Sequence, residues 1–224
     1  IDVINWIYAS SYESKHKKTR RERVKGSGAW LLKKQEYQGW YSDSGSTQLL
    51  WCHGKPGAGK TFIASAVIDE LLANRMERDI GIAYIYFDYA DKEAQSLENV
   101  FASVLKQVVL CKEKESIEEV RRLYRACNMG AQRPEIDTLV ETLGHMSQYF
   151  KQIFIVFDAL DECSDKLRAV LLKQLESLDN PRWRFFVTGR SHLSDVSMKF
   201  PSCSELVVAA HRDDVEKLVL ERIR

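Results

Sequence analysis

The sequence lacks the features that mark membrane-spanning, secreted or zinc-ribbon proteins. No apolar run among its 224 residues approaches the roughly 20 that a helix needs to cross a bilayer, and its first residues have no secretory signal layout. The five cysteines are scattered and never spaced as C-x-x-C, which argues against a disulfide framework or a zinc knuckle. We therefore expect a soluble, cytoplasmic chain with free thiols, cut from a longer protein.

An excess of charge of either sign is also missing. The chain has 33 Lys and Arg against 32 Asp and Glu, a net charge of +1. This balance gives no argument for a polyanionic partner, and we expect no nucleic acid and no membrane span. One local basic run is interpreted as a solvated face, with phosphate or partner binding as the alternative. It consists of Lys15, Lys17, Lys18, Arg20, Arg21, Arg23 and Lys25.

Apolar segments of two kinds alternate along the chain, without internal repeats or low-complexity stretches. Uninterrupted β-branched and aromatic runs predict buried strands, and three- and four-residue spacing predicts helices between them. Such alternation implies parallel strands joined by right-handed crossovers, in a three-layer α/β sandwich whose ligand lies at the carboxyl ends of the strands. Strands are expected before Gly54 and at residues 80–87, 153–157, 183–187 and 205–208.

Local capping signals set the expected helix boundaries. Ser96 is predicted to cap one helix, and Ser116 to open a capping box for another. Pro134 suits the first turn of a third helix. Two more helices are expected over residues 167–178 and 213–224.

A glycine-rich loop follows the first expected strand and leads into a helix. Its glycines allow backbone N–H groups to close around a polyphosphate. Lys60 supplies an ammonium for the β- and γ-phosphates, and Thr61 a hydroxyl for Mg²⁺, at the positive end of the helix. A chance glycine-rich turn is the alternative. The predicted nucleotide-binding residues are Gly54, Lys55, Pro56, Gly57, Ala58, Gly59, Lys60, Thr61 and Phe62.

Acidic residues follow the apolar run at 153–157. Asp158, the first of them, is placed to hold Mg²⁺ through a water in the manner of a Walker B aspartate. Asp161 and Glu162 come a turn later and are candidates to orient or deprotonate an attacking water. A helix cap or a surface pair is the alternative for these acids.

A third buried strand ends in polar residues at Arg190. Because parallel strands end at one edge of the sheet, this guanidinium is expected to face the γ-phosphate beside the acidic strand. Arg190 and Lys60 therefore join Asp161 and Glu162 as the predicted catalytic residues. A surface arginine at a strand-end turn is the alternative.

Taken together, these motifs resemble the NACHT domain of the STAND class of P-loop NTPases, and most of all its fungal NLR-like branch. The acidic segment is the most specific part, because the small Ala159 follows Asp158 and the further acids come two and three places on. The resemblance covers nearly the whole chain. It is carried by residues 26–32 with Tyr37 and Trp40, and by residues 54–61, 84–89, 158–162 and 188–190.

The resemblance implies a P-loop NTPase with a five-stranded parallel sheet in the order 5-1-4-3-2. It implies an extension over residues 1–47 that packs near the nucleotide base, and an NTPase core over 48–224 that stops before helical and winged-helix lids. Gly26, Ser27 and Gly28 become candidates for the base pocket. We interpret Trp30, Tyr37 and Trp40 as core packing rather than as a platform for the base.

The family implies an intracellular switch that rests with a nucleoside diphosphate, self-assembles with the triphosphate and resets by slow hydrolysis. Effector and ligand-sensing repeat domains are expected outside this chain. The expected cofactors are Mg²⁺ and ATP/ADP or GTP/GDP, since the sequence does not fix the base. The alternatives are a nucleotide-latched oligomerisation module without turnover and, less favoured, a small-molecule kinase, for which an arginine-rich lid insertion is missing.

Overall fold

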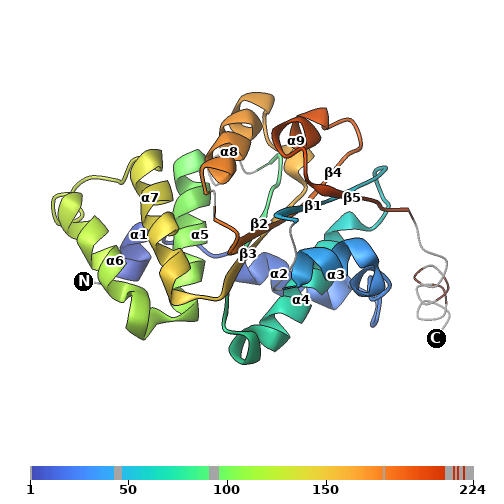
Figure 1. Cartoon of the computed structure of the whole chain (residues 1–224), viewed down its shortest axis with the longest axis horizontal. Helices are drawn as coiled ribbons and strands as arrows, with labels where there is room; N and C mark the ends of the chain where they lie inside the picture. Colours follow the sequence, from blue (N-terminus) through green and yellow to red (C-terminus); the bar gives the residue numbers. More distant parts are fainter. Residues whose placement is uncertain are drawn as a thin grey trace.

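A five-stranded parallel sheet organises the protein (Figure 1). The computed structural model describes residues 2–42, 47–90, 96–178 and 180–209, with Asp214, Glu216 and Val219. The strand order is β2-β3-β4-β1-β5, which is the expected 5-1-4-3-2 order read from the other edge, so the predicted fold class is confirmed. The strands are β1 (Leu49–His53), β2 (Ile80–Tyr86), β3 (Gln152–Asp158), β4 (Trp183–Gly189) and β5 (Ser204–Val207).

Helices cover both faces of the sheet, which explains why its central strands are apolar along their whole length. All seven residues of β3 and of β4 are buried. Along β3, Phe154 and Val156 pack towards α4 (Lys60–Arg78), whereas Ile153, Ile155 and Phe157 pack towards α5 (Leu97–Cys111). Figure 1 shows these two helices on opposite sides of the sheet. A strand buried on both faces is typical of a parallel sheet.

The remaining helices divide between the two faces. The α5 face also carries α1 (Val3–Ile7), α6 (Glu113–Ala126), α7 (Ile136–Met146), α8 (Asp165–Ser177) and α9 (Ser194–Lys199). The α4 face carries η1 (Leu31–Lys33) and α3 (Gln35–Tyr41), with α2 (Glu13–Glu22) lying along α4. Two further short 3₁₀ segments are η2 (Ser147–Tyr149) and η3 (Leu160–Glu162). Residues before β1 thus contact both faces of the sheet.

One of the three predicted helix starts is right, and two are wrong. Ser96 caps α5 by accepting a hydrogen bond from the Asn99 backbone N–H at 3.2 Å. Ser116 does not begin a helix, because α6 starts at Glu113, directly after the end of α5. Its hydroxyl instead donates to the Lys112 carbonyl at 2.8 Å from inside the first turns of α6. Pro134 lies just before α7 rather than in it.

Two further points concern the helices. Leu72 of α4 is 39% exposed, because the buried face of that helix passes through Ile63, Val67 and Leu71. The helix expected over 213–224 lies outside the described residues, apart from Asp214, Glu216 and Val219. Within the described ranges, the structure has no helix that combines the length and apolar character needed to cross a bilayer.

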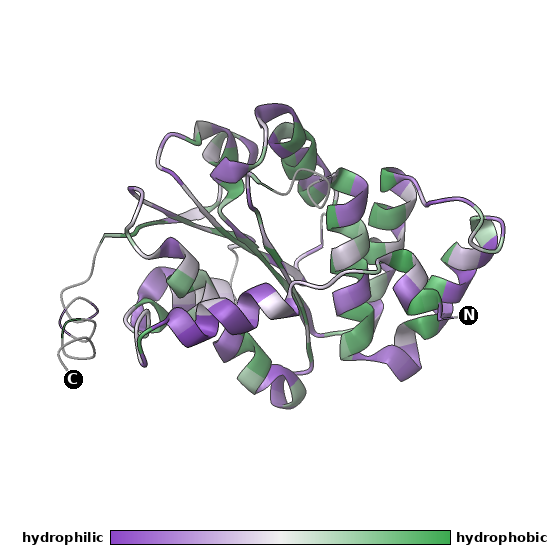
Figure 2. Ribbon diagram, turned by 180° about the vertical axis from the view of Figure 1, so that it is seen from behind, coloured by the Kyte–Doolittle hydropathy of each residue, from purple (hydrophilic) through white to green (hydrophobic). Residues whose placement is uncertain are grey.

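The α2 helix differs in composition from the other long helices. Its ten residues, Glu-Ser-Lys-His-Lys-Lys-Thr-Arg-Arg-Glu, include no apolar side chain, and its hydrophilic colouring stands out in Figure 2. The interpretation of the basic run as a solvated face holds for Lys17 and Lys18, whose side chains are 63% and 74% exposed. It is wrong for Arg23, whose side chain is 14% exposed and pairs with Asp69 of α4.

Candidate nucleotide-binding site

The loop between β1 and α4 lies where the carboxyl ends of three strands meet. Because β1 and β3 flank β4, the segments that follow these strands are neighbours. The Gly54 N–H donates to the Gly189 carbonyl at 3.2 Å, which joins the loop to the end of β4. A Cβ at Gly54 would collide with the Val208 carbonyl oxygen beyond β5, so only glycine fits this position.

The loop itself is shaped to surround an anion. Gly59 has a φ of +88°, a left-handed conformation that favours glycine, and α4 begins at the next residue. The Lys60 ammonium lies across the loop and donates to the carbonyls of Gly54 and Lys55, both at 2.9 Å. Partial burial lowers the pKa of Lys60, while Asp161 and Asp158 oppose that shift. A cationic group and a helix N-terminus at one loop suit a polyphosphate.

A buried carboxylate faces the first turn of α4. Asp158, the last residue of β3, is 2% exposed and accepts a hydrogen bond from the Thr188 hydroxyl at 2.6 Å. Burial raises its pKa most, whereas hydrogen bonds from Thr188 and Thr61 lower it. The same Thr188 oxygen accepts from the Ala159 N–H at 2.9 Å. Sequence reasoning missed this role of Thr188, although a hydroxyl at the end of a buried strand was a usable signal.

The oxygen donors at this point fit Mg²⁺. Asp158 and Thr61 belong to different elements, and the Thr61 hydroxyl lowers the pKa of Asp158, so the two side chains lie close enough to hold one ion. In the part of the chain that the structure describes, no three His, Cys, Asp or Glu side chains gather as a metal cluster. One carboxylate and one hydroxyl agree with the usual Mg²⁺ site of nucleotide-binding proteins, in which waters and phosphate oxygens supply the other ligands.

A sharp turn after Asp158 positions the next two acids. Ala159 adopts a left-handed conformation with φ +58°, which a small residue tolerates better than a branched one, and η3 follows. The Asp161 carboxylate pairs with the Arg190 guanidinium, with Oδ2 and Nε 2.8 Å apart. Glu162 accepts from the Tyr89 backbone N–H at 3.1 Å. The two acids therefore have different partners on opposite sides of β3.

Arg190 follows β4 and lies beside the acidic turn, as the sequence predicted. Its side chain is 52% exposed, whereas that of Asp161 is 8% exposed. A Cβ at Gly189 would lie 2.8 Å from Leu193 Cδ1 and 3.6 Å from Asp161 Oδ1, so it would displace the end of the Leu193 side chain but would only touch Asp161. The sequence did not predict the contact between Arg190 and Asp161, because it depends on the turn at Ala159.

The candidate base-pocket segment lies against the helix that starts at the loop. A Cβ at Gly28 would be 3.2 Å from the Ala66 Cβ and 3.6 Å from Ile63, which places Gly28, at the end of the candidate segment 26–28, against the first two turns of α4. The Trp30 indole N–H donates to Asp214 at 3.1 Å. Tyr37 and Trp40 are 1% and 0% exposed, which confirms their interpretation as core residues.

The strand order and the loop that joins β1 to α4 are those of P-loop NTPases, and the chain is a nucleotide-binding module of this class. Its residues 26–190 match the family described as Nephrocystin 3, N-terminal, and the chain belongs to that family. The match thus begins at Gly26 of the candidate base pocket and ends at Arg190, the candidate γ-phosphate contact.

A curated relative supports the same assignment. The vegetative incompatibility protein HET-E-1 of Podospora anserina is 28% identical over 168 residues, which cover 71% of this chain and 12% of that protein. The resemblance to a NACHT-type P-loop NTPase is confirmed. The chain spans only a small part of this relative, so the comparison concerns that part of the relative and not the rest of it.

Two solved structures share the fold. Cdc6p of Pyrobaculum aerophilum is 12% identical with a TM-score of 0.54, over 89% of this chain and 50% of that one. Drosophila ORC bound to DNA is 11% identical with a TM-score of 0.56, over 94% of this chain and 49% of that one. At such identities the likeness concerns the fold alone.

One expectation about partners is corrected by this comparison. The near-zero net charge led us to expect no nucleic-acid partner. That inference was wrong, because a structure with this fold is seen bound to DNA. Net charge averages over the whole surface, whereas phosphate contacts depend on local groups. The basic run in and after α2 is such a local concentration within a nearly neutral chain.

Proposed function

We propose that this chain is the nucleotide-controlled switch of a cytoplasmic signalling protein, which binds a nucleoside triphosphate with Mg²⁺ and hydrolyses it slowly to control self-assembly. The observation that carries the proposal is the ion pair between Asp161 and Arg190 at the edge of the phosphate loop. Arg190 is half exposed and already has an anionic partner. A terminal phosphate would offer it a second one, so the arginine has two alternative states.

The residues of the site divide the chemistry among them. Lys60 would neutralise phosphate charge, and Thr61 and Asp158 would hold Mg²⁺, which stabilises the charge that develops on the transferred phosphoryl group. Asp161 or Glu162 would orient the attacking water and accept its proton. Arg190 would interact with the γ-phosphate. Gly26, Ser27 and Gly28 remain candidates for the base pocket, and Gly28 lies beside the first turns of α4.

A nucleotide latch without turnover is the second candidate, and one observation favours it. Both carboxylates proposed for the water-orienting role are already engaged, Asp161 by Arg190 and Glu162 by the Tyr89 backbone. A general base that keeps such a partner orients water poorly. On this alternative the acids hold the loops in place, and nucleotide binding alone governs association.

Substitution of two lysines in the same loop tests the proposal. Lys60→Ala should weaken binding of fluorescent di- and triphosphates by about 100-fold or more, because charge-assisted hydrogen bonds to phosphate are lost. Lys55→Ala is the matched control, because Lys55 belongs to the loop through its backbone, whose carbonyl accepts from Lys60, whereas its side chain is exposed. Circular dichroism should show both variants folded.

The outcomes separate the candidates. A Lys60→Ala affinity equal to that of the parent would exclude the phosphate-binding role of the loop. Binding by the parent with no release of inorganic phosphate in single-turnover assays would favour the latch. Binding followed by slow phosphate release would favour the switch.

A further inference from the structure

The α2 helix is attached to the domain by polar contacts. Surface helices normally bury an apolar stripe against the core, but α2 contains no apolar residue, and its two buried side chains are His16 and Thr19. Apolar residues anchor the chain on either side of it, at Ile4 and Ile7 before and at Leu31 after. The helix is therefore a hydrophilic segment held between two apolar anchors, and we call residues Glu13–Glu22 the strap.

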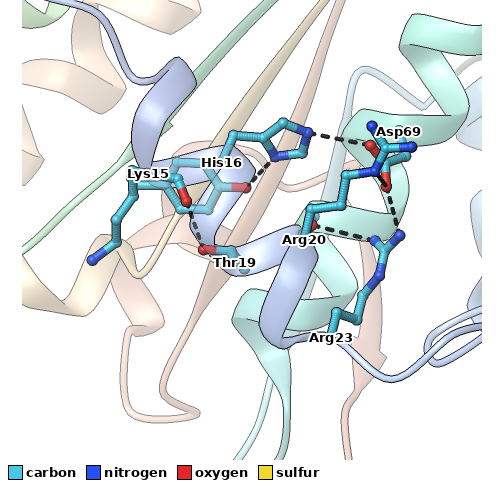
Figure 3. Close-up of polar contacts among 8 residues, drawn as sticks. Lys15, His16, Thr19, Arg20, Arg23 and Asp69 are labelled. Atoms are coloured by element: carbon cyan, nitrogen blue, oxygen red, sulfur yellow. Dashed lines mark hydrogen bonds and ion pairs between the residues drawn. The ribbon is translucent and has the colours of Figure 1, made fainter.

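Asp69 of α4 is the centre of this attachment (Figure 3). Its carboxylate lies 2.5 Å from an Arg23 Nη atom, 3.3 Å from His16 Nε2 and 3.4 Å from Arg20 Nε. The Asp69 side chain is 21% exposed and that of Arg23 14%, so their pairing is partly shielded from solvent. Lys15 pairs with Asp88 at 3.4 Å, but both side chains are nearly half exposed, and such pairs contribute little.

The attachment continues inward to the metal-binding carboxylate. The other His16 ring nitrogen, Nδ1, lies 2.8 Å from the Tyr86 hydroxyl. Tyr86 ends β2 and is registered opposite Asp158 of β3. Burial raises the pKa of Tyr86 most, and the nearby Asp158 charge raises it further. His16 therefore connects the strap to the strand end that carries Asp158.

A second route follows one side of α4. Thr61, Ser65 and Asp69 recur every four residues, so they lie on one stripe of the helix. Ser65 accepts from Arg23 at 3.3 Å, and Asp69 pairs with Arg23 and Arg20. Thr61 lowers the pKa of Asp158 and Ser65 lowers that of Tyr86, which places each hydroxyl beside that group. We call these three side chains the polar stripe of α4. It spans about 12 Å of helix, from the candidate metal site to α2.

We infer that α2 is a strap whose docking on Asp69 is coupled to Mg²⁺–nucleotide binding through the polar stripe of α4 and Tyr86. The inference rests on the proposed function. Thr61 and Asp158 would both ligate Mg²⁺. Ser65, one turn along α4 from Thr61, accepts from Arg23, and Tyr86, opposite Asp158 in the sheet, contacts His16 of the strap.

The sign of the coupling follows from charge. Residues 13–25 carry seven Lys or Arg against two Glu, whereas the whole chain has a net charge of +1. Docking keeps this positive segment near a site that receives an anionic ligand, and attraction through a partly buried region is less screened than through water. Docking and nucleotide binding should therefore favour each other, and thermodynamic linkage requires the two effects to be equal.

The experiment compares the parent with Asp69→Asn, which keeps the shape of the side chain and removes its charge. Amide hydrogen exchange over residues 13–23 and the Kd for Mg²⁺ with ADP or GDP, whichever binds better, are measured on the same samples. In the parent, nucleotide should slow exchange in α2. Asp69→Asn should speed that exchange and weaken nucleotide binding by roughly fivefold or more, within the usual range of coupling.

The controls keep the result interpretable. Glu13→Gln makes the same charge change on an exposed side chain that pairs with Lys17 within α2, and it should leave the Kd unchanged. Tyr86→Phe removes a single hydroxyl and tests the inner route if Asp69→Asn fails to fold. An α2 exchange rate that does not respond to bound nucleotide in the parent overturns the inference while the proposed function stands. A parent that binds no nucleotide overturns both.

Discussion

The helices α4 and α5 each follow a strand and cover opposite faces of the same sheet, yet they are built differently. On α5 the side chains that face the sheet are largely apolar, and Phe101, Val104 and Leu105 are all fully buried. The α4 helix buries an apolar stripe of its own, but its polar stripe of Thr61, Ser65 and Asp69 runs from beside Asp158 to the contacts with Arg23 and α2. One helix stabilises the fold, and the other also connects the site to the surface.

This contrast teaches that burial and function are separable within one sheet. Apolar packing on α5 is non-directional and cooperative, so changes there should affect the free energy of unfolding. Polar groups at the loop, at η3 and along α4 act through geometry and charge, so changes there should affect binding or turnover in a folded protein. Three predictions test this separation, in order of decreasing effect.

The largest effect is expected at the two acids of η3, Asp161 and Glu162. Glu162→Gln or Asp161→Asn should leave the triphosphate bound but slow its hydrolysis by roughly 10²- to 10⁴-fold, the usual scale for a lost general base. The measurement is single-turnover hydrolysis at saturating Mg²⁺ and nucleotide. Hydrolysis at the parent rate in both variants would remove the water-activating role.

Arg190→Ala is the matched comparison for Asp161→Asn, because the two side chains are paired. If Asp161 acts by positioning the arginine, both variants should lose affinity for the triphosphate more than for the diphosphate. If Asp161 acts on water, Asp161→Asn should change the rate alone. Both variants should unfold at the same urea concentration as the parent.

The second effect is expected in the α5 core. Leu105→Ala should lower the free energy of unfolding by about 2–5 kcal/mol, because Leu105 is fully buried and its removal leaves a cavity. Leu110→Ala on the same helix is the control, since Leu110 is 47% exposed. Urea unfolding measures both. A change in the nucleotide Kd of folded Leu105→Ala protein would break the comparison between the helices.

The smallest effect concerns pH and His16, which contacts Asp69, Tyr86 and Tyr84 and lies near Arg20 and Arg23. Burial lowers the pKa of His16 below its ordinary value of 6.5, although Asp69 opposes this shift. The unfolded chain therefore takes up the proton first. The stabilisation by neutral His16 is present above pH 6.5 and is lost as the pH falls towards the folded pKa.

Thermal unfolding between pH 7.5 and 5.5 checks this sign. The parent should lose more stability on acidification than His16→Gln, which has no imidazole to titrate. A larger loss in the variant would mean that the imidazolium is favoured beside Asp69 and that the shift has the opposite sign.

The sheet could be predicted because its signals are local and repeat along the chain. Uninterrupted apolar runs gave the strands, and the loop, Asp158 and Arg190 follow those runs directly. Ser116 shows the limit of such signals, because its capping box is overridden by the immediate succession of α5 and α6. The pairing of Asp161 with Arg190 was also out of reach, since it depends on a left-handed turn at Ala159.

The role of α2 shows a second limit. A run of basic residues reads as a solvated face when it lacks an apolar stripe. The sequence cannot show that Asp69, more than 40 positions later, receives Arg20 and Arg23, or that His16 is buried against Tyr86. Contacts of this kind depend on two helices lying side by side, which is a property of the tertiary fold.

The close approach at Gly54 has a consequence for reading natural variation in this chain. Gly59 is constrained by its backbone dihedral, and nothing lies within 4 Å of where its Cβ would be. Gly54 is constrained by a neighbour, the Val208 carbonyl on the chain beyond β5. A Gly54→Ala allele would therefore displace the edge of the sheet, and its phenotype would reflect misfolding rather than lost nucleotide chemistry. A Lys60→Ala allele would instead lose nucleotide binding in a folded protein.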